Sequence, residues 1–190
     1  MPEQAREADT AHISSPSLSL REKATVGCVI LTVAIGNLFF FYSRGLNNLY
    51  GDSMSHMEGA RRIFDSLTPG YQEIGTVWLP MTHLLVAPFA TNDFLWRSGL
   101  GGGIVSTAAF AITAWILFTL AFQMNRSLGA AVLALVSFLF CPNMLYLAST
   151  PLTEPLALLW MGLAVYGLFR YWEDGSLRTL AAASLAAFCG

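Results

Sequence analysis

Long uncharged apolar blocks constrain this chain more than any other feature of its sequence. Residues 24–42 run for 19 positions without a charge, and further apolar blocks follow at 100–122, 128–147 and 152–171, the last with one acidic residue near its start. A helix of about 20 apolar residues crosses the hydrocarbon core of a bilayer. Only 12% of the residues are charged, against roughly 25% in a water-soluble domain. We therefore expect an all-α integral membrane protein with about four transmembrane helices.

The two ends of the chain differ from these blocks. Residues 1–23 are polar and mixed in charge, so we expect a disordered cytoplasmic tail. Residues 177–190 are apolar but too few to span, which predicts an incomplete fifth span in the N-terminal part of a longer protein. Arg21 and Lys23 flank the first span and favour a cytoplasmic N-terminus. The predicted location is the cytoplasmic (inner) membrane, crossed several times.

Charge and cysteine content exclude several classes of function. The formal net charge of −2 provides no basic field, so the sequence argues against binding nucleic acid. Cys28, Cys141 and Cys189 are scattered through apolar blocks without a Cys/His cluster. They predict neither a disulfide framework nor a structural metal site.

Residues 43–98 form an outer loop that is too long for a turn, and such loops commonly carry function. Its first part has apolar residues at helical spacing, which predicts an amphipathic helix at the membrane surface. These residues are Met57, Ala60, Phe64 and Leu67. Residues 77–90 are apolar but contain two prolines, so we expect a second interfacial helix rather than a span. The loop thus contains two juxtamembrane helices.

Asp52 is the first candidate catalytic residue. It opens the first of these helices, where a role as helix N-cap alone would explain it. A carboxylate at the bilayer edge can also accept a proton from an acceptor hydroxyl, or hold a divalent metal ion beside a phosphate. His56 follows four residues later and is expected on the same helix face.

Glu154 is the second candidate, because an acid entering an apolar helix is costly and frequently functional. The alternative is an acid in the first turn of a helix that Thr150 caps and Pro151 begins, where the helix dipole stabilises it. Both acids are predicted to lie on the same side of the membrane.

Four further polar residues are candidate contacts for a phosphate. Guanidinium groups at head-group level bind phosphates, although arginine side chains also extend to the interface without a ligand. A histidine can donate to a phosphate or simply be satisfied within the protein. The residues are Arg61, Arg62, His83 and Arg97.

Three segments, taken in order, resemble the C-type (GT-C fold) membrane glycosyltransferases, in particular the bacterial relatives of protein mannosyltransferases and of the aminoarabinose transferase of lipid A. Residues 51–56 (GDSMSH) with the following Ala60 to Arg62 look like the acidic motif and helix of the first loop. Residues 77–83 (VWLPMTH) look like the second juxtamembrane segment, and 152–156 (LTEPL) is similar to the second acidic site. The resemblance covers roughly residues 24–190.

This resemblance implies glycosyl transfer from a polyprenyl-phosphate-linked sugar to an acceptor on the outer side of the cytoplasmic membrane. Asp52 would be the base on the acceptor hydroxyl, and Glu154 would support it or help to bind a metal. His83 and the arginines would meet the donor phosphate. The family often has an acidic pair where this chain has one acid, which leaves metal dependence open.

Two other readings compete with this one. A non-catalytic membrane subunit or assembly factor would use the same acids and arginines only for capping, pairing and interfacial anchoring. A transporter fragment would need broken or polar helices at the bilayer midplane, for which Asn37 and the Pro142–Asn143 pair are the only hints.

Overall fold

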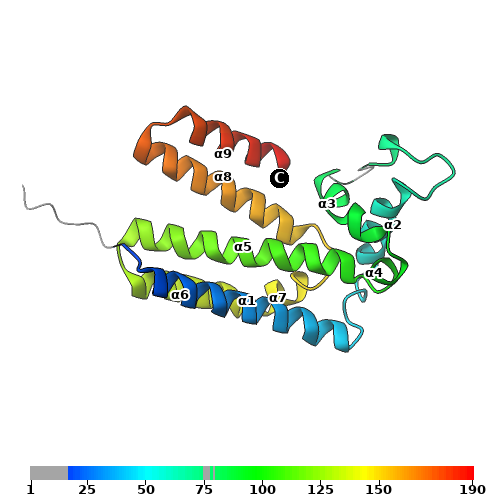
Figure 1. Cartoon of the computed structure of the whole chain (residues 1–190), viewed down its shortest axis with the longest axis horizontal. Coiled ribbons are helices and arrows are strands. Elements are labelled where there is room, and N and C mark those ends of the chain that lie inside the picture. Colours follow the sequence, from blue (N-terminus) through cyan, green and yellow to red (C-terminus); the bar gives the residue numbers. More distant parts are fainter. Residues whose placement is uncertain (1–16, 75–77, 79) are drawn as a thin grey trace, which may run out of the picture.

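The computed structural model describes residues 17–74, 78 and 80–190, and these residues form helices and no strands (Figure 1). The helices are α1 (Leu20–Ser43), α2 (Gly51–Arg62), the 3-10 helix η1 (Tyr71–Glu73), α3 (Pro80–Ala90), α4 (Asp93–Arg97), α5 (Leu100–Asn125), α6 (Leu128–Leu139), α7 (Pro142–Leu147), α8 (Glu154–Asp174) and α9 (Leu177–Cys189). The expected all-α fold is confirmed.

α5 lies at the centre of the arrangement. α1 and α6 lie along one side of it, and α8 packs on the opposite side with α9 beyond (Figure 1). The shorter helices α2, α3 and α4 gather at the end where α1 stops and α5 begins (Figure 1). The long connection between α1 and α5 is thus folded onto one end of the bundle.

Two of the described helices, α1 and α5, are long and apolar enough to cross a membrane. α5 is half-buried within the bundle, whereas α1 leaves most of its surface open. Leu31, Ile35 and Phe39 form an exposed stripe on α1 at a spacing of four residues. α6 has only 12 residues, and α8 has charged residues near both ends. Neither helix is therefore long and apolar enough by the same measure.

α1 begins earlier than the apolar pattern predicts. Ser19 and Glu22 form a capping box, in which the Ser19 side chain accepts from the Glu22 amide and Glu22 accepts from the Ser19 amide. The predicted tail of residues 1–23 is therefore wrong from Leu20 onward, since this cap starts the helix before the uncharged block. Residues 1–16 lie outside the described part of the chain.

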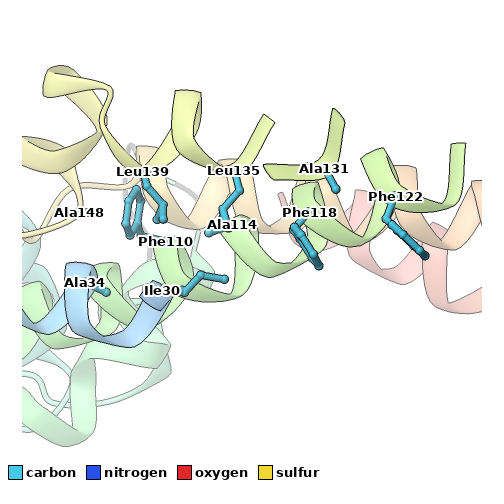
Figure 2. Close-up of a cluster of buried hydrophobic side chains, with 10 residues drawn as sticks. All are labelled: Ile30, Ala34, Phe110, Ala114, Phe118, Phe122, Ala131, Leu135, Leu139 and Ala148. Atoms are coloured by element: carbon cyan, nitrogen blue, oxygen red, sulfur yellow. The ribbon is translucent and has the colours of Figure 1, made fainter. Parts of the chain in front are cut away.

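The principal hydrophobic core fills the space between α1, α5 and α6 (Figure 2). Phe110, Phe118 and Phe122 extend from α5, and the ring of Phe110 stacks on that of Phe138 at 4.9 Å between centroids. A second cluster joins α5 to α8 through residues such as Ile116 and Leu156. α5 thus contributes to both apolar interfaces that hold the bundle together.

The predicted span at 128–147 is two helices rather than one. α6 ends at Leu139, and α7 starts at Pro142 after a break at Phe140 and Cys141. Proline lacks the amide hydrogen that an uninterrupted helix would need at this position. The apolar pattern continues through residue 142, but the proline at this position ends α6 before it.

Side chains from α1, its following loop and α5 bind the backbone of residues 145–152. Asn37 Nδ2 donates to the carbonyl of Leu145 at 2.6 Å, and Asn47 Nδ2 donates to that of Ser149 at 2.5 Å. Thr107 Oγ1 donates to the carbonyl of Ala148 at 2.9 Å. These bonds satisfy carbonyls that the end of α7 leaves without helical partners. They also fix the chain directly before α8.

Three consecutive glycines at the start of α5 allow close packing at the same place. A Cβ on Gly102 would lie 2.8 Å from Pro151 Cα and 3.1 Å from Met57 Sδ. A Cβ on Gly103 would lie 2.8 Å from the Ser149 carbonyl oxygen. Only glycine therefore lets α2 and the segment before α8 meet on α5.

Candidate functional site

α2 and α3 pack against each other through one face of each helix. The buried face of α2 comprises Ser53, His56, Met57 and Ala60. The buried face of α3 comprises Thr82, His83, Val86, Ala87 and Ala90. Positions three and four apart share a helix face, so each set forms one continuous surface. Both faces include a histidine, which brings two imidazoles into the interface.

The two imidazoles are in direct contact. His56 Nδ1 lies 3.3 Å from His83 Nε2, and both side chains are buried. The ring of Trp78 lies 4.5 Å from that of His56 between centroids. Gly59 permits this packing, because a Cβ there would come within 3.0 Å of His83 Nε2. Two residues that the sequence presents as separate candidates thus belong to one cluster.

Burial lowers the pKa of both histidines. For His56 this is the main cause, and the negative charge of Asp52 partly opposes it. The pKa of His83 is lowered first by burial and then by its neighbour His56. Both rings are therefore neutral at pH 7, and one donates its N–H to the other. A neutral pair can relay a proton, but it supplies no fixed positive charge.

Two polar atoms beside the pair are buried and have no hydrogen-bond partner within the described residues. They are Ser53 Oγ and His83 Nδ1. Buried polar groups usually have a partner, so unpaired ones in a cluster mark a place where a bound group could be accommodated.

Asp52 lies in the first turn of α2, one turn before His56, and its side chain is exposed. The N-cap of α2 is Tyr50, and no side chain makes a capping hydrogen bond there. The interpretation of Asp52 as the helix cap is therefore wrong. Its carboxylate is open to a ligand, and the positive end of the helix dipole stabilises its charge.

Glu154 is exposed and is the first residue of α8. The expected helix start at Thr150 and Pro151 is wrong, because Thr150 Oγ1 instead donates to the carbonyl of Leu147 at 2.8 Å. Pro155 occupies the first turn beside Glu154. The position suits an acid that complements the helix dipole and leaves its carboxylate accessible.

The segments that carry the two acids meet on α5. Met57, five residues after Asp52, and Pro151, three residues before Glu154, both pack against Gly102. The structure thus places α2 and the start of α8 at the same end of the bundle. No hydrogen bond or ion pair joins Asp52 to Glu154 among the described residues.

Arg61 is less available for binding a phosphate than the sequence predicts. Arg61 forms ion pairs with Asp93 at 2.5 Å and Asp65 at 3.1 Å, and its guanidinium lies 4.3 Å from the Trp96 ring centroid. The same pairing lowers the pKa of Asp93. Arg61 therefore ties α2 to α4.

The two remaining arginines, Arg62 and Arg97, are exposed. Arg62 lies 4.0 Å from Glu58, and Arg97 lies over the Trp96 ring at 5.4 Å. Both therefore stay accessible to a ligand, as does Arg44 at the end of α1.

A groove of about 270 Å³ runs between α3, α8 and the end of α9. Trp78 and Thr82 line one side, while Thr153 and Trp160 line the other. Trp78 also contacts His56 through a tilted ring pair, so the groove adjoins the histidine pair. Glu154 follows Thr153 directly, which places the start of α8 at the same groove. The lining combines aromatic rings with two hydroxyl groups, as ligand-binding clefts commonly do.

Sequence reasoning missed the place of Trp78 between the histidines and the groove. It also missed the packing role of residues 101–103, although three consecutive glycines in an apolar helix are a recognisable sign of close helix contact. No cluster of three or more potential metal ligands occurs in the portion of the chain that the structure covers. Val77 and Leu79 of the second motif lie outside the described residues.

No protein-family model, curated protein or solved structure matches this chain.

Proposed function

We propose that this chain transfers a sugar from a polyprenyl-phosphate donor to an acceptor hydroxyl at the end of the bundle formed by α2 and α3. The observation that carries the proposal is that the exposed Asp52 lies one turn before His56 of the buried histidine pair. His56 in turn contacts Trp78, which lines the groove. The resemblance of the three motifs to C-type glycosyltransferases supports the same assignment.

In the proposed reaction Asp52 accepts the proton of the acceptor hydroxyl as its oxygen attacks the anomeric carbon. The bond from that carbon to the phosphate oxygen breaks, and polyprenyl phosphate leaves with inversion at the sugar. Arg62 and Arg97 are exposed cations of this end that could meet the phosphate. Glu154 supports the acceptor side of the groove.

The membrane arrangement forms part of the proposal. α1 and α5 cross the cytoplasmic membrane, with the N-terminus in the cytoplasm and α2 and α3 at the outer surface. Exposed apolar side chains on α6 and α8 support a lipid environment for these helices as well. They include Val132, Leu133, Met161 and Val165. α5 would then be the central one of four spans, with α9 as a partial fifth.

The test is transfer of labelled sugar from polyprenyl-phosphate donors by membranes that contain the full-length protein. Asp52→Asn should lower transfer by about 10²–10⁴-fold, the usual contribution of a general base. Glu58→Gln is the matched control, because it neutralises an exposed acid on the same helix. Equal activity of wild type and Asp52→Asn, at equal protein levels, would refute the proposed role.

The second candidate function is that of a non-catalytic membrane subunit. The ion pairs of Arg61 with Asp65 and Asp93 favour it, because they give a residue of the candidate site a purely structural task. A subunit of this kind would keep its phenotype in Asp52→Asn but lose it when Arg61→Ala separates α2 from α4. The two variants therefore discriminate between the candidates.

A further inference from the structure

A second pocket lies at the opposite end of the bundle from the candidate site. It has a volume of about 410 Å³ and lies where α1 begins and α5 ends. Lys23 of α1 and Arg126, which follows α5, line it together with Trp115, Phe122, Gln123 and Tyr166. The lining thus combines two cations with an aromatic wall.

The two cations lie at the depth expected for lipid phosphates. Lys23 is in the first turn of α1, and Arg126 is the C-cap of α5. These are the two helices that are long and apolar enough to cross a membrane. Their ends at this side of the bundle would therefore lie at the level of the head groups. Basic pockets between helices at this level commonly bind anionic lipid head groups.

The backbone at Arg126 supports a role for its side chain. Arg126 has a φ of 51°, and it is the only non-glycine residue at positive φ within the described ranges. Glycine is the usual residue at such a helix end, as Gly175 is after α8. An arginine at a position where glycine would be less strained points to a use for its guanidinium.

Polar chemistry in the pocket matches a glycerophosphate group. The guanidinium of Arg126 lies 3.9 Å from Glu173, which also lies 4.0 Å from Arg170, so one carboxylate is shared between two cations. Gln123 Oε1 is buried and accepts no hydrogen bond from any described residue. A head group with both phosphate oxygens and hydroxyl donors would satisfy these groups together.

We propose that this pocket binds an anionic glycerophospholipid, with its phosphate between Lys23 and Arg126 and its acyl chain along Trp115 and Phe122. The site is separate from the proposed transferase site and does not depend on it. A free phosphate could bind the same two cations, but it has no apolar part to pack against the aromatic wall.

The test is native mass spectrometry of the full-length protein purified from vesicles of phosphatidylglycerol and phosphatidylcholine. Wild type should retain phosphatidylglycerol in preference to phosphatidylcholine. Lys23→Gln and Arg126→Gln should each lower retention about fivefold, the effect of one interfacial cation on an anionic lipid. Arg178→Gln is the control, since this exposed arginine starts α9 at the same end but lies outside the pocket.

Arg126→Gly separates binding from folding. It removes the cation while relieving the backbone, so its melting temperature should rise as phosphatidylglycerol retention falls. Equal retention of both lipids, an equal loss in Arg178→Gln, or displacement of the lipid by millimolar inorganic phosphate would overturn the proposal.

Discussion

His56 Nδ1 and His83 Nε2 face each other at 3.3 Å across the interface between α2 and α3. The contact joins two helices from the long connection between α1 and α5, and both rings are buried. Because each ring loses solvation there, the interface favours the neutral form of both. The stability of this end of the molecule should consequently depend on pH.

We expect acid to destabilise the protein through this pair. Burial lowers the pKa of each histidine in the folded state, so the unfolded chain binds protons first as the pH falls below about 6.5. The free energy of unfolding should therefore be fully retained above that pH and decrease below it, by at most about 1.4 kcal/mol per pH unit for each histidine. Thermal unfolding in detergent between pH 7.5 and 5.0 measures this slope.

The variant His83→Gln should flatten the dependence while keeping a polar side chain at the interface. A wild-type melting temperature that stays constant from pH 7.5 to 5.0 would contradict a buried neutral pair.

Gly102→Ala should disrupt the packing of α2 and of the segment before α8 on α5. The new methyl group would lie 2.8 Å from Pro151 Cα and 3.1 Å from Met57 Sδ, and a proline backbone cannot move aside easily. We expect a loss of roughly 1–3 kcal/mol in the free energy of unfolding, as for other overpacked interiors. Gly36→Ala is the control, because nothing lies within 4 Å of its added Cβ. Equal stability of the two variants would contradict the close contact of Gly102 with Pro151 and Met57.

Asn47→Ala should leave the carbonyl of Ser149 without its donor in a buried position. The bond from Asn47 Nδ2 to that oxygen measures 2.5 Å, and an unpaired buried acceptor costs about 1–3 kcal/mol. Asn48→Ala is the neighbouring control, since its bond to the Arg97 carbonyl is exposed. Chemical denaturation should place the midpoint of Asn47→Ala clearly below that of Asn48→Ala, and a reversed order would argue against the buried bond.

The proposed membrane arrangement predicts opposite labelling of two engineered cysteines. In a background that lacks Cys28, Cys141 and Cys189, Leu67→Cys should react with a membrane-impermeant thiol reagent added outside the cell. Ser127→Cys should react only after the membrane is permeabilised. Both parent side chains are exposed, so access depends on the side of the membrane alone. Labelling of both from outside would rule out this topology for α1 and α5.

The long helices could be predicted because their apolar blocks are local and uninterrupted. The block at 100–122 becomes α5, and the block at 24–42 becomes α1, extended by the Ser19–Glu22 cap that the sequence already contains. Pro142 likewise marks the break after α6 in the sequence itself. These features depend on neighbouring residues, so sequence patterns are sufficient to find them.

The candidate site was harder to predict because it depends on contacts between distant segments. The apolar spacing predicts one helix face that runs from Met57 to Leu67 at the membrane surface. In the structure Met57 and Ala60 are buried against α3 and α5, whereas the helix ends at Arg62, and Phe64 and Leu67 are exposed. Nothing local indicates that His56 meets His83, which lies 27 residues later. Tertiary packing determines both which residues of α2 are buried and which histidines meet.

The hydrogen bonds that hold residues 145–152 also determine how the groove could respond to a ligand. Donors from α1, its following loop and α5 hold the backbone immediately before α8. The start of α8, which forms one side of the groove, is therefore anchored to the centre of the bundle. A ligand wider than the groove would have to displace α3 or the end of α9 instead. Because α3 carries His83, such a displacement would separate the two imidazoles and expose them to water. Occupancy of the groove and the proton affinity of the histidines would then be thermodynamically linked.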